Sequence, residues 1–230
     1  MTKKELEVYA ALVLVKTSQI SEPFSTDWLK DRPDIQIGKF GIEVTEAIGK
    51  REGEQRQLDS NILRCETYEN ANKYISNLKY PKKYHSETKQ LPGSERFSLM
   101  SGGGYNDKEF NDLIVNRIHD KSSKFLKYPD CKKFSRRGLY ISDQELRPCM
   151  QLLDIESIRK ATKDSVFDVV FVHQLRRLIV VEKDDELTKE YPFDKINRDE
   201  AICEAKRVCG SPDYVICCER AKAYRESKDY

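Results

Sequence analysis

The chain has 230 residues, 38% of them hydrophobic and 35% charged, which suits one domain with elaborations around a sizeable core. Lysine and arginine total 41 against 39 acidic residues, so the net charge of +2 excludes a globally basic protein, and a nucleic-acid surface has to be a local patch. The sequence has no apolar run of membrane-spanning length, and its start lacks the apolar core of a signal peptide. Seven cysteines without a Cys-x-x-Cys pair argue against a zinc ribbon and favour reduced thiols, so we expect a cytoplasmic protein without a membrane partner.

The first predicted elements are a helix and a group of short strands. Residues 3–17 place apolar side chains on one face at helical spacing, which predicts a helix. A first strand is expected over residues 24–28. An alternating stretch at 34–38 and an apolar run at 41–46 predict two more strands, and the short link at Gly38 joins them as a hairpin.

The middle of the chain is more polar. Residues 52–78 are compatible with a helix, and the glycines and prolines of residues 81–105 predict a long loop. Apolar side chains then repeat at helical spacing from about Asp107 until Pro129 ends the pattern. A buried strand is expected over residues 138–142.

The last third predicts a hairpin and a helix. Strands are expected over 167–172 and 178–182, and Asn197 is expected to cap a helix over 198–208. Together the elements predict an α/β protein. Its domains are a core over residues 1–150, with a long insertion at 50–107, and a C-terminal α/β extension over residues 151–230 that packs on the core.

Two acidic residues lie on neighbouring strands of the expected hairpin. Asp34 begins one strand, and Glu43 lies nine residues later in the next, between Ile42 and Val44. Carboxylates that converge from adjacent strands supply the oxygen ligands that Mg²⁺ requires. Alternatively, Asp34 caps a turn and Glu43 lies on a solvated face. The apolar neighbours of Glu43 argue against that alternative, because burial of an unpaired carboxylate is costly.

The order helix, three strands, helix, strand and the pattern Pro33-Asp34 followed by Glu43-Val44-Thr45 resemble the PD-(D/E)XK nuclease superfamily. The resemblance implies a restriction-endonuclease-like αβββαβ core, with a mixed central sheet flanked by helices. It also implies a nuclease dependent on Mg²⁺ or Mn²⁺ that hydrolyses phosphodiester bonds in DNA, with RNA left open. Asp34 and Glu43 would then be catalytic and metal-binding, and the Val44 carbonyl would be a further ligand.

Thr45 departs from the family pattern, which has lysine two residues after the acid. Threonine carries no charge that can stabilise the attacked phosphate. We expect Lys121 to be the catalytic lysine, because it shares a helical face with Ile118 and Phe125 and a lysine on an apolar face needs an anionic partner. A structural lysine that reaches the solvent is the alternative, and Lys39 in the hairpin turn is a weaker substitute.

Other charged residues are candidates for ligand contacts. Glu7 lies in a pattern similar to the first helix of Holliday-junction-resolvase-like members, where the glutamate approaches the metal; an exposed helical glutamate is the alternative. Basic side chains neutralise phosphates, although solvated lysines are common. The candidate nucleic-acid-binding residues are Lys82, Lys83, Lys89, Arg96 and Lys124.

A second hypothesis belongs to another functional class. A PD-(D/E)XK domain without catalytic activity could bind nucleic acid or protein, and Thr45 keeps this reading open. The expected partner is nucleic acid, with DNA favoured over RNA, and a homodimer is left open.

Overall fold

The computed structural model describes residues 1–47, 54, 58–59, 61–78, 85–102, 107–143, 152–215 and 217–219. The chain forms two compact units. The first consists of Met1–Ala47 and Phe110–Tyr230, and the second of Ile48–Glu109. The second unit covers the interval of the expected insertion, whereas the first unit runs through residue 150, where the sequence suggested a division.

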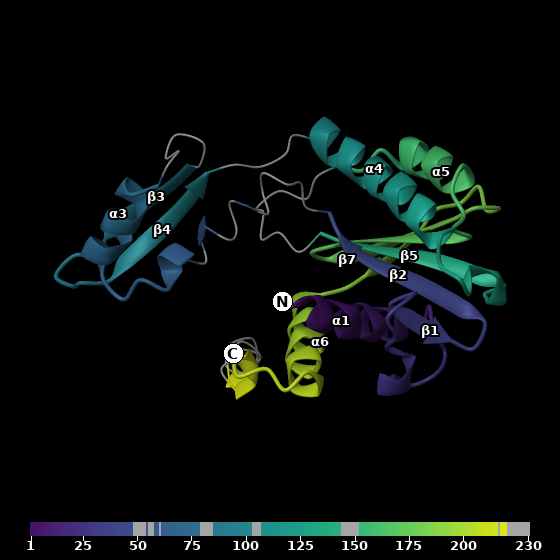
Figure 1. Cartoon of the computed structure of the whole chain (residues 1–230), viewed down its shortest axis with the longest axis horizontal. Helices are drawn as coiled ribbons and strands as arrows, with labels where there is room; N and C mark the ends of the chain where they lie inside the picture. The colour runs from purple at the N-terminus through teal and green to yellow at the C-terminus, as the bar shows by residue number, and fades with distance from the viewer. Residues whose placement is uncertain are drawn as a thin grey trace. The chain divides into compact units, whose positions relative to one another are not determined.

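A six-stranded mixed sheet forms the centre of the first unit, in the order β1-β2-β5-β6-β7-β8 (Figure 1). β1 (Ile35–Ile37) and β2 (Phe40–Glu46) form the expected antiparallel hairpin, with Ile35 opposite Ile42. Gly38 has φ +55° in the link, a conformation that favours glycine. β5 (Arg136–Ser142) pairs parallel to β2.

The other half of the sheet comes from the C-terminal part of the chain. β6 (Val169–Gln174) pairs parallel to β5, and β7 (Arg177–Glu182) pairs antiparallel to β6. β8 (Lys189–Pro192) then pairs antiparallel to β7. The chain is therefore a mixed α/β protein, in which the strands of the expected extension belong to the same sheet as those of the expected core.

Helices cover both faces of this sheet (Figure 1). α4 (Asp107–Phe125) and α5 (Ile155–Lys163) lie on one face of the sheet. α4 lies between the parallel strands β2 and β5 in the chain, and α5 lies between the parallel strands β5 and β6. Crossover connections between parallel strands are right-handed, which puts both helices on the same face. α1 (Lys3–Lys16) and α6 (Lys195–Val208) lie on the other face. Every residue of α1 from Glu5 to Leu14 is buried, so even its acidic side chains are removed from bulk water. No helix in the described ranges is long and apolar enough to cross a membrane.

Local hydrogen bonds explain two differences from the sequence-based expectations. The first strand expected at 24–28 is wrong, because a 3₁₀ turn at Thr26–Trp28 begins where the Ser25 hydroxyl accepts from the amide of Asp27. The cap of α6 is Asp194 rather than Asn197. Its carboxylate accepts from the backbone N–H of Asn197 at 2.7 Å, so the helix begins earlier than predicted.

The second unit contains a helix and a two-stranded antiparallel sheet. α3 (Tyr68–Ser76) packs Ala71 against Leu58 and Ile62. The long loop expected at 81–105 is wrong over the described part of that interval, which holds β3 (His85–Gln90) and β4 (Phe97–Gly102).

The turn between these two strands is tight. The amide of Leu91 donates to the carbonyl of Arg96 at 2.9 Å, and Gly93 has φ +69°. The glycine and proline that suggested a loop therefore belong to a hairpin turn. β3 has no alternation of apolar and polar residues, which is the pattern that would have revealed a strand.

Candidate functional site

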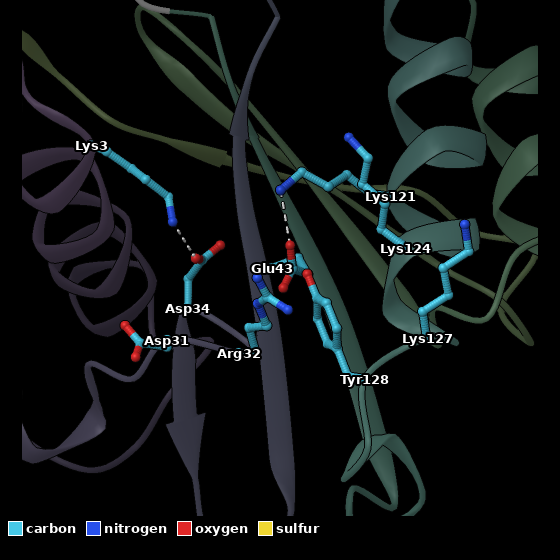
Figure 2. A pocket seen from close by; sticks show the side chains of 9 residues that line it. All are labelled: Lys3, Asp31, Arg32, Asp34, Glu43, Lys121, Lys124, Lys127 and Tyr128. Carbon is cyan, nitrogen blue, oxygen red and sulfur yellow. Dashed lines mark hydrogen bonds and ion pairs between the residues drawn. The ribbon is translucent and has the colours of Figure 1, made fainter.

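A pocket of about 360 Å³ lies in the first unit where β1, β2, the start of α1 and the end of α4 meet (Figure 2). The acids are held on the strands, and lysines approach them from a helix on each face of the sheet. The lining residues are Lys3, Asp31, Arg32, Asp34, Glu43, Lys121, Lys124, Lys127 and Tyr128.

Asp34 and Glu43 occupy the floor of this pocket and are almost fully buried, at 3% and 1% exposure. The β1–β2 register pairs Ile35 with Ile42, so its continuation by one residue brings Asp34 opposite Glu43. Asp34 Oδ2 accepts from the backbone N–H of Val44 at 2.8 Å. The Asp34 carboxylate therefore accepts the hydrogen bond that a backbone carbonyl would accept if β1 were longer. This bond fixes the orientation of the carboxylate.

Lys3 reaches the same carboxylate from the first turn of α1. Its Nζ lies 3.1 Å from Asp34 Oδ1 and 3.1 Å from Glu7 Oε1 (Figure 2). Partial burial lowers the pKa of Lys3, but the charges and hydrogen bonds of Asp34 and Glu7 outweigh it and hold that pKa above its usual value. Lys3 is therefore an ammonium ion at neutral pH.

Glu7 lies on the inner side of α1, one turn after Lys3. The alternative that it is an exposed helical glutamate is wrong, because only 9% of the residue is accessible. Burial and, next, the negative charge of Asp34 raise the pKa of Glu7, against the opposing effect of Lys3. The structure thus brings Glu7 and Asp34 to one ammonium group.

Lys121 approaches Glu43 from α4. Its Nζ lies 2.8 Å from Glu43 Oε2 and 3.4 Å from the carbonyl oxygen of Val44. Ile118 and Phe125, on the same helical face, are buried, and the Lys121 side chain is only 19% exposed. The lysine therefore runs along the covered side of the helix and ends at the acid.

The second oxygen of Glu43 is less well paired than the first. Oε1 is buried, and no group in the described ranges forms a hydrogen bond of regular geometry with it. The Tyr128 phenol lies nearby, where burial and then the charge of Glu43 raise its pKa above the usual value (Figure 2). A buried carboxylate oxygen without a well-aligned donor is uncommon in folded proteins and suits a position that accepts a ligand.

The remaining candidate residues lie in different places. Lys124 lines the pocket together with Lys127, and the ammonium group of neither forms a hydrogen bond or ion pair within the described residues. Lys82 and Lys83 lie outside the described residues. Lys89, in β3, and Arg96, just before β4, belong to the second unit.

The carboxylates fit a hard divalent cation in chemistry, although their oxygens are largely engaged. Within the described ranges, no three His, Cys, Asp or Glu side chains are already arranged to hold a metal ion. Three of the four oxygens of Asp34 and Glu43 already accept hydrogen bonds, which come from the Val44 amide, Lys3 and Lys121. Carboxylate and carbonyl oxygens are the ligands that Mg²⁺ and Mn²⁺ prefer, and Oε1 of Glu43, which has no hydrogen bond of regular geometry among the described residues, is the oxygen most open to a cation.

Sequence reasoning missed five residues that line the pocket: Lys3, Asp31, Arg32, Lys127 and Tyr128. The spacing of Lys3 and Glu7, four residues apart on a predicted helix, was a usable signal for an ion pair. Arg32 stacks over the Tyr128 ring, 5.6 Å from its centre, and no local sequence pattern connects these two residues.

Comparison of the chain with protein-family models, curated proteins and solved structures finds no match. Functional assignment therefore rests on the chemistry and geometry of the pocket.

Proposed function

We propose that the chain is a metal-dependent nuclease of the PD-(D/E)XK type that hydrolyses phosphodiester bonds in DNA. The observation that carries this proposal is the contact of Lys121 with Glu43 at 2.8 Å, beside Asp34 in one pocket. Two buried acids and an ammonium group are the set that the resemblance to PD-(D/E)XK nucleases implies for metal-dependent hydrolysis of a phosphodiester. Here the ammonium comes from α4, because Thr45 occupies the position where the family pattern has lysine.

The order of elements in the first unit supports a restriction-endonuclease-like core. Within the first unit the order is α1, β1, β2, α4 and β5, with β2 paired to both β1 and β5; Asp34 immediately precedes β1 and Glu43 lies within β2. The expected first strand is reduced to a single bridge between Leu29 and Ile35. Hence the proposal draws on a helix, two strands, a helix and a strand rather than on the full αβββαβ order.

The residues have separate roles in this proposal. Asp34, Glu43, Glu7 and the Val44 carbonyl would hold Mg²⁺ or Mn²⁺, which supplies activation of water and charge compensation at the phosphate. Lys121 places a fixed positive charge at the acids, where it stabilises charge on the attacked phosphate. One preorganised contact of this kind contributes about 10²–10³ in rate.

Lys124 and Lys127 lie on the wall of the same pocket and are available to phosphates next to the attacked one. Cations without an acidic partner release counterions when they meet a nucleic-acid backbone, which favours association. This arrangement gives the pocket two regions: acids neutralised at the floor, and on one wall two ammonium groups without an acidic partner among the described residues.

The test is a cleavage assay on labelled single-stranded and duplex DNA with Mg²⁺, Mn²⁺ or EDTA. We expect metal-dependent cleavage by the native chain, no cleavage by Glu43→Gln, and a turnover number reduced about 10²–10³-fold by Lys121→Ala. Lys160→Ala is the matched control, since Lys160 is exposed on α5 and does not line the pocket. Equal cleavage by the native chain and Glu43→Gln would contradict the mechanism.

A second candidate is a catalytically silent domain that binds nucleic acid or protein. The observation that favours it is that lysines already neutralise both acids, with no preformed group of three metal-binding side chains among the described residues. Oligonucleotide binding that persists in EDTA, together with no cleavage and no metal binding, would identify this function.

A further inference from the structure

We propose that Lys3 is a stand-in cation: it neutralises Asp34 and Glu7 when the pocket holds no metal and moves into solvent when a divalent ion binds. The inference rests on the proposed metal site. Its starting observation is that Lys3 Nζ lies 3.1 Å from each of two carboxylates expected to bind metal. An ammonium at hydrogen-bond distance from both occupies the region that a shared cation needs.

The metal-free acids require such a cation. Asp34 is 3% exposed and Glu7 is 9% exposed. Adjacent carboxylates removed from water repel each other, and a buried charge without a partner is costly. Asp34 has one further donor, the amide of Val44. Lys3 therefore supplies the positive charge on the α1 side of the pocket.

The two lysines of the pocket differ in how easily they can leave. The Lys3 side chain is 72% exposed although its ammonium contacts the acids, whereas that of Lys121 is 19% exposed. In Figure 2, Lys3 extends from the end of α1, and Lys121 reaches Glu43 from α4 on the other side of β2. Lys3 can turn into water without opening the core, but Lys121 cannot.

The charge balance favours an exchange of one lysine rather than two. When all are ionised, Glu7, Asp34 and Glu43 carry three negative charges, and Lys3 and Lys121, the two lysines that contact them, carry two positive ones. A divalent ion that replaced Lys3 would bring the group to neutrality and leave Lys121 in place. A divalent ion added beside both lysines would instead leave an excess positive charge in a largely buried pocket, which is unfavourable.

Competition between Lys3 and the metal gives a measurable consequence. Ion pairs with a largely exposed partner contribute modestly, so removal of Lys3 should tighten Mn²⁺ binding about two- to fivefold. Lys4 provides a matched control: it carries the same charge one residue later, is exposed, and forms no ion pair among the described residues. Lys4→Ala should therefore leave the affinity unchanged.

Two measurements on the full chain test the exchange. Calorimetric titration with Mn²⁺ alone compares the native chain with Lys3→Ala, Lys3→Gln, Lys4→Ala and Glu43→Gln. Acetylation of lysines, followed by mass spectrometry, compares the reactivity of the Lys3 amine without and with saturating Mn²⁺. We expect tighter binding in both Lys3 variants, and a rise of Lys3 labelling with metal while Lys4 labelling stays constant.

The outcomes separate this inference from the proposed function. Metal binding that is lost in Glu43→Gln but equal in the native chain and both Lys3 variants overturns the stand-in role and leaves the metal site intact. Weaker binding in the Lys3 variants, or unchanged Lys3 labelling on saturation, also overturns it. Metal binding absent from the native chain and the Lys3 variants alike overturns both the stand-in role and the proposed metal-dependent nuclease.

Discussion

Replacement of Lys121 by methionine removes the ammonium group from a carboxylate that has almost no access to water. Glu43 is 1% exposed, and its Oε2 accepts from Lys121 at 2.8 Å. Loss of one partner from a fully buried ion pair costs about 3–5 kcal/mol. Because the Lys121 side chain is 19% exposed and water can partly replace the ammonium, we expect a loss of about 2–3 kcal/mol in the free energy of unfolding.

The assay is thermal or urea unfolding followed by tryptophan fluorescence. The chain has a single tryptophan, Trp28, which lies buried in the first unit, so its emission reports unfolding of the unit that contains the site. For a unit of this size the expected loss lowers the melting midpoint by about 4–12 °C. Lys124→Met is the matched control, as the same substitution on the same helix at a lysine that has no ion pair with any described residue, and should change stability by less than about 0.5 kcal/mol.

A double-mutant cycle isolates the charge pair from the loss of packing. In a Glu43→Gln background the buried charge is absent, so Lys121→Met should cost little, and the double variant should be more stable than Lys121→Met alone. Equal destabilisation by Lys121→Met in the two backgrounds would refute the pairing. This test does not depend on any activity, so it examines the geometry of the site separately from its proposed chemistry.

Two further predictions concern other buried polar groups. Asp34→Ala should destabilise the first unit by about 1–3 kcal/mol, since it leaves the Val44 amide without an acceptor; Asp34→Asn should cost less in urea unfolding, and equal losses would contradict this role. Burial, with a smaller effect of Arg198, lowers the pKa of His173 to about 3. The unfolded state therefore takes up a proton near its ordinary pKa of about 6.5 that the folded state refuses, and stability should fall between about pH 6.5 and pH 3 by up to about 1.4 kcal/mol per pH unit. Urea unfolding at pH 7 and pH 5 should show a smaller loss in His173→Gln than in the native chain; an identical pH dependence would exclude this contribution.

The elements that the sequence predicted well are those with a local pattern. Ile35 and Ile37 alternate around Gln36, and Gly38 follows in the left-handed conformation that a tight link requires. The apolar stripe of α4 likewise directs Lys121 toward the sheet, and the structure places its ammonium at Glu43. That this lysine acts in catalysis remains a prediction.

The missed elements depend on distant partners. β8 is mostly exposed and has no apolar alternation. α5 is a different case: it begins at the Asp154 cap in an interval for which the sequence suggested no helix, although Ile158 and Ala161 lie buried at helical spacing and gave a usable local signal. β6 and β7 were expected as a hairpin of an extension. Their place beside β5 depends on pairing across long sequence separations, which propensity does not encode.

The residues of the pocket also fall into two groups: those that a local sequence pattern predicts, and those that only tertiary packing brings together. Asp34 and Glu43 could be proposed because a hairpin brings them together within nine residues. Tyr128 and Arg32 are far apart in the sequence, and their stacking over the pocket follows only from the packing of α4 on the sheet. A contact of this kind, between a loop before β1 and the end of α4, has no local sequence signal, whereas the apolar stripe of α4 did predict Lys121.

Thr45 leaves β2 without the lysine of the family pattern, but another element can supply the ammonium group. A lysine on β2 and a lysine on α4 are chemically equivalent if each brings an ammonium group to the same carboxylate. Lys121 does so at 2.8 Å, from a stem packed along buried residues. Lys3, the proposed stand-in cation on the other side of β2, contacts the other two acids, and its side chain is largely exposed. A fixed lysine beside Glu43 and a displaceable one beside Asp34 give the pocket one cation suited to charge stabilisation and one suited to exchange, so the absence of a lysine at position 45 does not by itself argue against catalysis.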